Sequence, residues 1–113
     1  LYPGIYGLSN AFLDTPWPKV QRSKAAFTQL IQDKPDAAAM MEIMRNSDTA
    51  DDADLPETGV PFEWEKKLSA MFITSENYGT RLTRFVSIDK QRNVTFREKG
   101  YVPENDTIIQ FKY

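Results

Sequence analysis

The sequence predicts an α+β fold in which helices cover one face of an antiparallel sheet. Two observations support this class: two amphipathic helical stretches occupy the first half of the chain, and a β-rich hairpin and a last strand follow them. With 113 residues, the chain is predicted to be one domain, residues 1–113. A chain of this size can bury about two thirds of the surface that its unfolded form exposes.

The first 18 residues are predicted to form a strand and a loop. Gly4–Ser9 is short, apolar and bounded by turn-forming residues, which favours a buried strand. Asn10–Pro18 contains two prolines, and a residue that precedes a proline prefers extended geometry. Pro18 itself suits the first turn of a helix, where its missing N–H is not needed.

Two helices are predicted next. Over residues 19–32, apolar residues recur at helical spacing: Val20, Phe27, Leu30 and Ile31. Asp36 is expected to cap the second helix, whose apolar stripe consists of Ala37, Met40, Met41 and Met44. We prefer core packing over a methionine-lined ligand groove for this stripe, because Met usually fills gaps in a core.

An acidic loop and a third helical segment follow. Residues 46–59 carry five carboxylates: Asp48, Asp51, Asp52, Asp54 and Glu57. Their spacing lacks the glycine and the final glutamate of an EF-hand, so a solvated loop is preferred over a calcium site. Residues 61–68 are predicted to be helical with Phe62 and Trp64 as apolar positions, and residues 69–73 fit either the helix end or a short strand.

The hairpin is the strongest local pattern in the sequence. Residues 82–89 and 94–99 form its arms, and Asp89–Asn93 connects them, with Asn93 as the residue that tolerates positive φ. Residues 100–106 are expected to be a polar connection and residues 107–113 the last strand. The first arm is apolar on more than one side, so the second face of the sheet needs a cover. We expect that cover to come from a missing N-terminal half or from a second copy in a homodimer.

Composition excludes several kinds of function. Lys and Arg number 14 against 16 Asp and Glu, a net charge of -2, which argues against a nucleic-acid binder. The chain has no cysteine and no histidine, so it holds no disulfide, no thiolate nucleophile, no usual zinc site and no His-based triad. No resident metal or cofactor is expected. No apolar window has the length of a membrane span, which is about 20 residues, and no leader pattern opens the chain. We therefore expect a cytoplasmic protein, and Leu at position 1 suggests a fragment.

Three polar clusters are candidates for a site. Asn10, next to Ser9, can donate to an oxyanion or to a ligand carbonyl, although both residues also suit a turn or cap. Arg81, next to Thr80, presents a planar fork that suits a carboxylate, and an ion pair with an acidic neighbour is equally compatible. Thr80 is a poor nucleophile without an adjacent base. The rigid turn around Trp17 is either a ligand wall or, more often, a cap on the core.

Taken in their order along the chain, these clusters resemble the NRDE family, also known as the transport and Golgi organisation protein 2 family. The matching segments read YGLSN at residues 6–10, DTPWPK at residues 14–19 and YGTR at residues 78–81. The resemblance covers nearly the whole chain and corresponds to the C-terminal half of the family. The sequence departs from the family at Arg84, where relatives have a small polar residue, and at Arg97–Lys99, where they have a Glu-Arg pair.

The resemblance implies the C-terminal part of an αββα sandwich like that of N-terminal-nucleophile hydrolases. In such enzymes an N-terminal cysteine is the nucleophile and its own α-amine is the base. Because that cysteine and the Asn-Arg-Asp-Glu signature lie upstream in the family, this piece is expected to be inert alone. Asn10 and Arg81 would then be supporting donors in a parent that hydrolyses an amide.

The alternative that the resemblance implies is a non-enzymatic binding or trafficking role. Eukaryotic members of the family are linked to secretory organisation, lipid metabolism and haem handling. The cleft would then hold a small-molecule ligand, whose identity the sequence does not give, without cutting it. Axial haem ligands from this half could come only from Met or Tyr.

Overall fold

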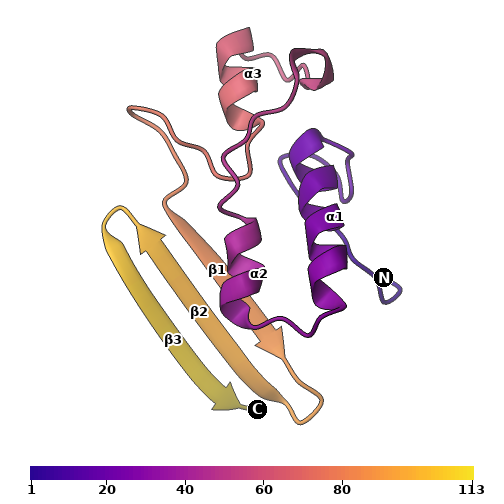
Figure 1. The fold of residues 1–113 in the computed structure, drawn as a ribbon, viewed down its shortest axis with the longest axis vertical. Coiled ribbons are helices and arrows are strands. Elements are labelled where there is room, and N and C mark those ends of the chain that lie inside the picture. Colours follow the sequence, from indigo (N-terminus) through magenta and orange to yellow (C-terminus); the bar gives the residue numbers. More distant parts are fainter.

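The computed structural model describes all 113 residues as an α+β chain, which confirms the predicted class. Helices α1 (Pro18–Ile31), α2 (Ala37–Ile43) and α3 (Phe62–Leu68) precede strands β1 (Leu82–Ile88), β2 (Asn93–Tyr101) and β3 (Glu104–Lys112). The strands form one antiparallel sheet in the order β1-β2-β3. Figure 1 shows α2 beside β1 and α1 beside α2. No helix has both the length and the apolar character that crossing a membrane requires.

Helix α1 begins where the sequence predicts, but its apolar stripe is only partly buried. Trp17 is extended, with φ -66° and ψ 150°, and Pro18 occupies the first turn, where proline has no lost hydrogen bond. Val20 is buried, whereas Ile31 at the last turn is exposed. The apolar stripe therefore packs inward mainly in its first half.

Helix α2 is capped as predicted. The Asp36 carboxylate accepts a hydrogen bond from the Ala39 N–H at 2.8 Å, which satisfies one of the free amides at the helix start. Met41 is buried and Met44 is exposed. The helix packs mainly against α1 and β1, so helices cover only the part of the sheet next to β1.

The hairpin turn is confirmed, but the residue with positive φ is Arg92, at 68°, rather than Asn93. Asn93 is already the first residue of β2. Its backbone N–H and its side-chain amide both donate to the Asp89 carboxylate, at 2.9 and 2.8 Å. Because these two bonds hold Asn93 in the strand, the preceding residue takes the left-handed conformation.

Two predictions of local structure were wrong. Gly4–Ser9 forms no strand, because the N–H and C=O of Gly7 both bond to Asp14, at 2.7 Å each, and no other strand runs beside them. Residues 100–106 are not a long connection. Strand β2 continues to Tyr101 and β3 begins at Glu104, so only Val102 and Pro103 form the loop.

The third helix is confirmed, and the residue that it buries is a charged one. Phe62 and Trp64 are exposed, and Glu65 is the buried residue of the helix. Ser69 caps the C-terminal end of α3, and residues 70–72 form bends rather than a strand. The two aromatic residues of α3 therefore do not face the core of these 113 residues.

The two faces of the sheet have different cover. On the first face, which we call the helix-side face, Thr83 is buried and its hydroxyl lies 3.0 Å from the Tyr101 hydroxyl. The Phe72 ring meets the Tyr101 ring edge to face, with 4.9 Å between centroids. Arg45, just after α2, lies over both rings. Loop residues thus complete the cover that α2 begins.

On the second face, two apolar rows cross all three strands. We call these six residues the open-face patch: Ile88, Val94 and Phe111 in one row, and Val86, Phe96 and Ile109 in the next. In a third row Arg84 pairs with Glu98 at 2.7 Å. The four patch residues on the outer strands are each more than half exposed. Val94, on the central strand, is one of the nine buried residues, and Val86 and Ile88 on the edge strand also line the groove beside α1 and α2. The outer-strand residues of this face still lack cover from these 113 residues.

Candidate functional site

A cavity of about 390 Å³ lies where the N-terminal loop, the start of α1 and helix α3 come together. Segments far apart in the sequence form its walls, and its lining mixes apolar and polar groups as ligand sites do. The lining residues are Asn10, Trp17, Pro18, Lys19, Pro56, Thr58, Val60, Glu65, Leu68, Ser69, Ile73 and Tyr78.

Lys19 provides the positive charge of this cavity. Its position in the first turn of α1 places the side chain near the end of α3, and Nζ donates to the Leu68 carbonyl at 3.1 Å. The ammonium also lies 5.9 Å from the centre of the Trp17 ring. Burial lowers the pKa of Lys19, because removal from water disfavours the charged form. A lysine ammonium has three donors, so donors remain for a ligand.

Glu65 provides the negative charge. Its Oε1 accepts hydrogen bonds from the Thr58 hydroxyl at 2.6 Å and from the Thr58 N–H at 2.7 Å. These bonds lower the pKa of Glu65, the side-chain bond first and the backbone bond second. The carboxylate is therefore ionised at neutral pH, and it ties the 55–60 loop to α3.

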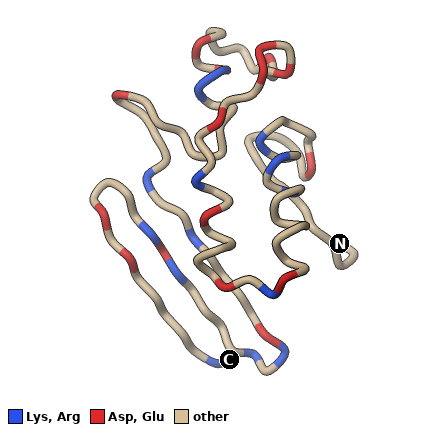
Figure 2. Tube along the Cα trace, viewed as in Figure 1, with Lys and Arg blue, Asp and Glu red and all other residues tan.

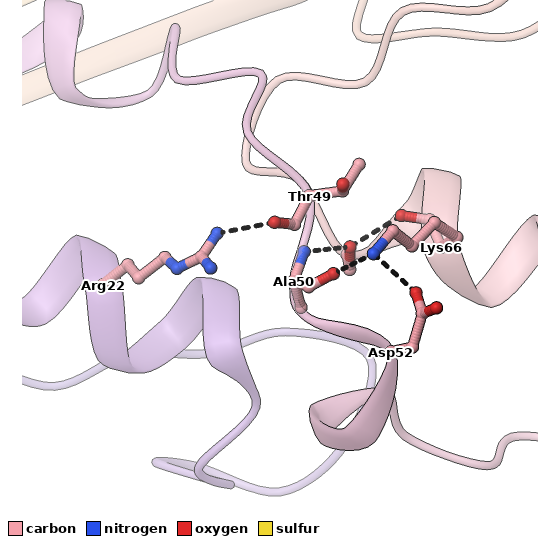
Figure 3. A network of polar contacts seen from close by, with 6 residues as sticks. Arg22, Thr49, Ala50, Asp52 and Lys66 are labelled. Carbon is pink, nitrogen blue, oxygen red and sulfur yellow. Dashed lines mark hydrogen bonds and ion pairs between the residues drawn. The ribbon is translucent and has the colours of Figure 1, made fainter.

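A network of polar contacts fixes the acidic loop that leads to this wall (Figure 3). Arg22 of α1 donates to the Thr49 carbonyl at 3.2 Å. Lys66 of α3 donates to the Ala50 carbonyl and pairs with Asp52 at 2.7 Å. The Ala50 N–H in turn donates to the Ser69 hydroxyl at 2.8 Å. No three acidic residues lie close enough together to hold a metal ion, and the loop instead anchors α1 to α3.

Tyr78 closes another side of the cavity. The segment before β1 folds back on itself through the bridge between Thr74 and Gly79. A Cβ on Gly79 would lie 2.7 Å from the Ile73 carbonyl oxygen, so the close backbone approach requires glycine. The Tyr78 ring then meets the Trp64 ring edge to face at 5.8 Å between centroids.

The structure places the four predicted site residues in different surroundings. Asn10 lines the cavity, with Ser9 beside it in the chain. Thr80 accepts the Ile73 N–H on its hydroxyl at 2.9 Å, so it holds the fold-back before β1. Arg81 is exposed and its backbone carbonyl accepts the Tyr101 N–H at 2.9 Å. Asn10 and Arg81 therefore do not share a wall of this cavity. Trp17, for which the sequence favoured a core cap over a ligand wall, does line it.

Sequence reasoning missed Lys19, Glu65 and Thr58. The signal for Lys19 was present, because it is the last residue of the DTPWPK segment and follows the proline that starts α1. Glu65 gave no signal, since it lies among charged residues on α3 and nothing in their order marks it as the buried position.

A second, larger groove lies between α1, α2 and β1. It measures about 750 Å³ and most of its lining is apolar, including Met40, Met41, Met44 and Phe85. Met41 is buried there, so the methionine stripe serves core packing at this position. The rest of the stripe borders open space, and the core between helices and sheet is not filled by these 113 residues.

Comparison with known proteins identifies the family. The family model described as Transport and Golgi organisation 2 matches residues 1–103. The chain belongs to this family. It is 29% identical over 120 residues to a Transport and Golgi organization protein 2 homolog of Bos taurus. It is 27% identical over 118 residues to the homolog of Homo sapiens and 26% identical over 118 residues to that of Mus musculus.

These matches cover most of this chain but less than half of the relatives. They include 95% of this chain and 42% of the bovine protein, and 93% of this chain and 41% of the human and mouse proteins. The chain thus spans about two fifths of the length of the curated relatives that it matches.

Proposed function

We propose that the cavity around Lys19 is a small-molecule binding site of this Transport and Golgi organisation 2 family protein. The observation that carries the proposal is a half-buried lysine with donors to spare, which lines a cavity together with aromatic and apolar groups. Desolvation strengthens the attraction of an ammonium for an opposite charge. Lys19 is therefore the group that would anchor a ligand.

The ligand that fits this site has a carboxylate or an amide carbonyl joined to a modest apolar group. Lys19 and Asn10 supply donors for the oxygen atoms. Trp17, Val60 and Leu68 supply apolar contact for the remainder. Glu65 keeps its negative charge and its bonds to Thr58. Its charge disfavours a ligand with more than one carboxylate.

Fluorescence titration with a matched pair of compounds tests this proposal. The chain has two tryptophans, and Trp64→Phe leaves Trp17 as the single reporter beside Lys19. N-acetyl-leucine carries the carboxylate and N-acetyl-leucine amide lacks the charge. We expect the acid to bind about 10-fold or more tightly than the amide, because a hydrogen bond to a charged group contributes about 1.5–3 kcal/mol.

The variant Lys19→Met removes the charge and keeps the length of the side chain. It should abolish the preference for the acid, while Lys90→Met, in the exposed hairpin turn, should preserve it. Equal affinity of the two compounds for the unsubstituted pocket, or a preference that survives Lys19→Met, would contradict the proposed role of the lysine.

Amide hydrolysis is the second candidate, and the position of Asn10 on the same cavity favours it. The chain has no cysteine, so a nucleophile would come from the rest of the family protein. Asn10 would then donate to the developing oxyanion, a contribution of about 10²–10³ in kcat. The test is Asn10→Ala in a full-length family protein that carries this sequence, with amide hydrolysis as the readout. An unchanged rate would remove Asn10 from the oxyanion role.

A further inference from the structure

The chain exposes more surface than a self-contained protein of its size. Its accessible surface is 8470 Å², whereas a compact monomer of 13.0 kDa has about 6,300 Å². The excess of about 2,200 Å² is larger than one side of a standard interface, about 800 Å², and lies in the range of one side of a permanent interface, about 1,000–2,500 Å². A surface of this extent indicates a missing neighbour rather than a transient partner.

The open-face patch contributes apolar surface to this excess, because its four residues on the outer strands are each more than half exposed. Its two rows each join three strands without a charged residue. Figure 2 shows charged residues in the middle of β2, at the start of β3 and at the hairpin turn, with uncharged stretches along the strands. An uncovered apolar sheet face of this kind is typical of one layer of a two-layer core.

We propose that the open-face patch packs against polypeptide of the same family protein that lies outside these 113 residues. The argument for this occupant is length. The matched relatives are more than twice as long as the part that this chain covers, so each has ample polypeptide for a second layer. A layer on the same chain is held at high effective concentration and needs no separate association step.

The row next to the patch sets the limit of that layer. Arg84 and Glu98 pair across β1 and β2, with the Arg84 side chain 59% exposed. Covering a charge is unfavourable unless it stays paired and hydrogen-bonded. The covering layer is therefore apolar over the rows of Val86 and Ile88 and polar, or absent, over the row of Arg84.

Two neighbouring isoleucines give a matched test. Ile109 belongs to the patch, and Ile108 points to the helix-side face in a row with Arg97 and Phe85. Both are similarly exposed, at 51% and 57%. Because the chain has no cysteine, Ile109→Cys and Ile108→Cys each introduce a single thiol without a new charge. The rate of reaction with a maleimide then measures the exposure of each position.

In the 113-residue chain both thiols should react at similar rates. In a full-length family protein that carries this sequence, the thiol at 109 should react at least about 100-fold more slowly than the thiol at 108, since opening of a packed layer limits access. Labelling of the full-length protein without either substitution gives the background.

Two results would overturn the proposal. In the first, the two thiols react equally fast in the full-length protein. In the second, the thiol at 109 is protected in the 113-residue chain itself and the protection rises with protein concentration, which would identify a second copy as the occupant.

Discussion

The helix-side face and the open face of the sheet belong to the same three strands, yet they are stabilised in different ways. On the helix-side face the groups where β1 begins and β2 ends have specific partners, as Thr83 has Tyr101 and Tyr101 has Phe72. On the open face the same strands present apolar rows whose outer-strand members are each more than half exposed. The comparison shows that a strand pattern defines which sides are apolar, whereas the partner of each side depends on the rest of the polypeptide.

The largest effect is expected from removing a side chain that joins the helices to the sheet. Met41 of α2 is buried and lines the groove beside β1. Met41→Ala should lower the free energy of unfolding by about 2–4 kcal/mol, because it deletes buried atoms and enlarges the existing groove. Urea denaturation measures this loss. Met44→Ala, at an exposed position of the same stripe, should lower the free energy by less than about 1 kcal/mol. Equal losses would mean that α2 does not pack through Met41.

The next effect should arise at the fold-back that leads into β1. Gly79→Ala brings a Cβ to 2.7 Å from the Ile73 carbonyl oxygen. Since the contact is with backbone, the Thr74–Gly79 bridge must open, and we expect a loss of about 1–3 kcal/mol. The same change should move Tyr78 and weaken ligand binding at the Lys19 cavity. Thermal unfolding and the fluorescence titration measure the two consequences, and normal values for both would show that the backbone relaxes without strain.

Substitution on the open face should have a small effect in this chain. Ile88 is 59% exposed, so Ile88→Thr should change the free energy of unfolding by less than about 0.5 kcal/mol. The corresponding change on the helix-side face, Phe85→Thr, should cost about 1–3 kcal/mol, because Phe85 is half-buried against the groove. In a longer family protein the difference should shrink, since Ile88 would then be buried too. A large loss from Ile88→Thr in the 113-residue chain would show that the open face is already covered.

The sequence predicted features that depend on neighbouring residues better than features that depend on distant segments. Pro18, the Asp36 cap and the turn at Asp89 act within a few residues, and each was found where the sequence placed it. Gly4–Ser9 has the composition of a strand, but pairing requires a neighbour, and Asp14 takes its polar groups instead.

The candidate site was less predictable than the fold. Asn10 was found from its position after a short apolar segment, and it does line a cavity. Glu65 and Thr58 meet only because α3 folds back on the loop that precedes it, and no periodicity encodes that meeting. Arg81 was named for its chemistry alone, and its side chain faces solvent.

The smallest effect on stability is expected at the hairpin turn. The turn fixes the pairing register of β1 and β2, and the register decides which side chains lie on each face of the sheet. A slip of one residue between β1 and β2 would exchange the faces of every side chain on one strand. Asp89 opposes this slip, because its carboxylate accepts two backbone N–H bonds, from Gln91 and Asn93, as well as the Asn93 side-chain amide. These bonds, with that of the Asn93 side chain as the largest cause, lower the pKa of Asp89 below 3.8.

The contribution of Asp89 therefore has a defined pH dependence. The pKa of Asp89 is lower in the folded state than in the unfolded state, where it is 3.8. Above pH 3.8 the ionised carboxylate therefore contributes its full stabilisation of the folded state. This stabilisation is lost as the pH falls through the pKa of the folded state. Asp89→Asn should be less stable than the original chain at pH 7, and the difference should shrink below pH 3.8 as the Asp89 carboxylate becomes protonated. Urea denaturation of both proteins across this range measures the difference, in which the other carboxylates cancel. A difference that stays constant down to pH 2 would mean that the charge of Asp89 does not hold the register, and the assignment of the two faces would then depend on packing alone.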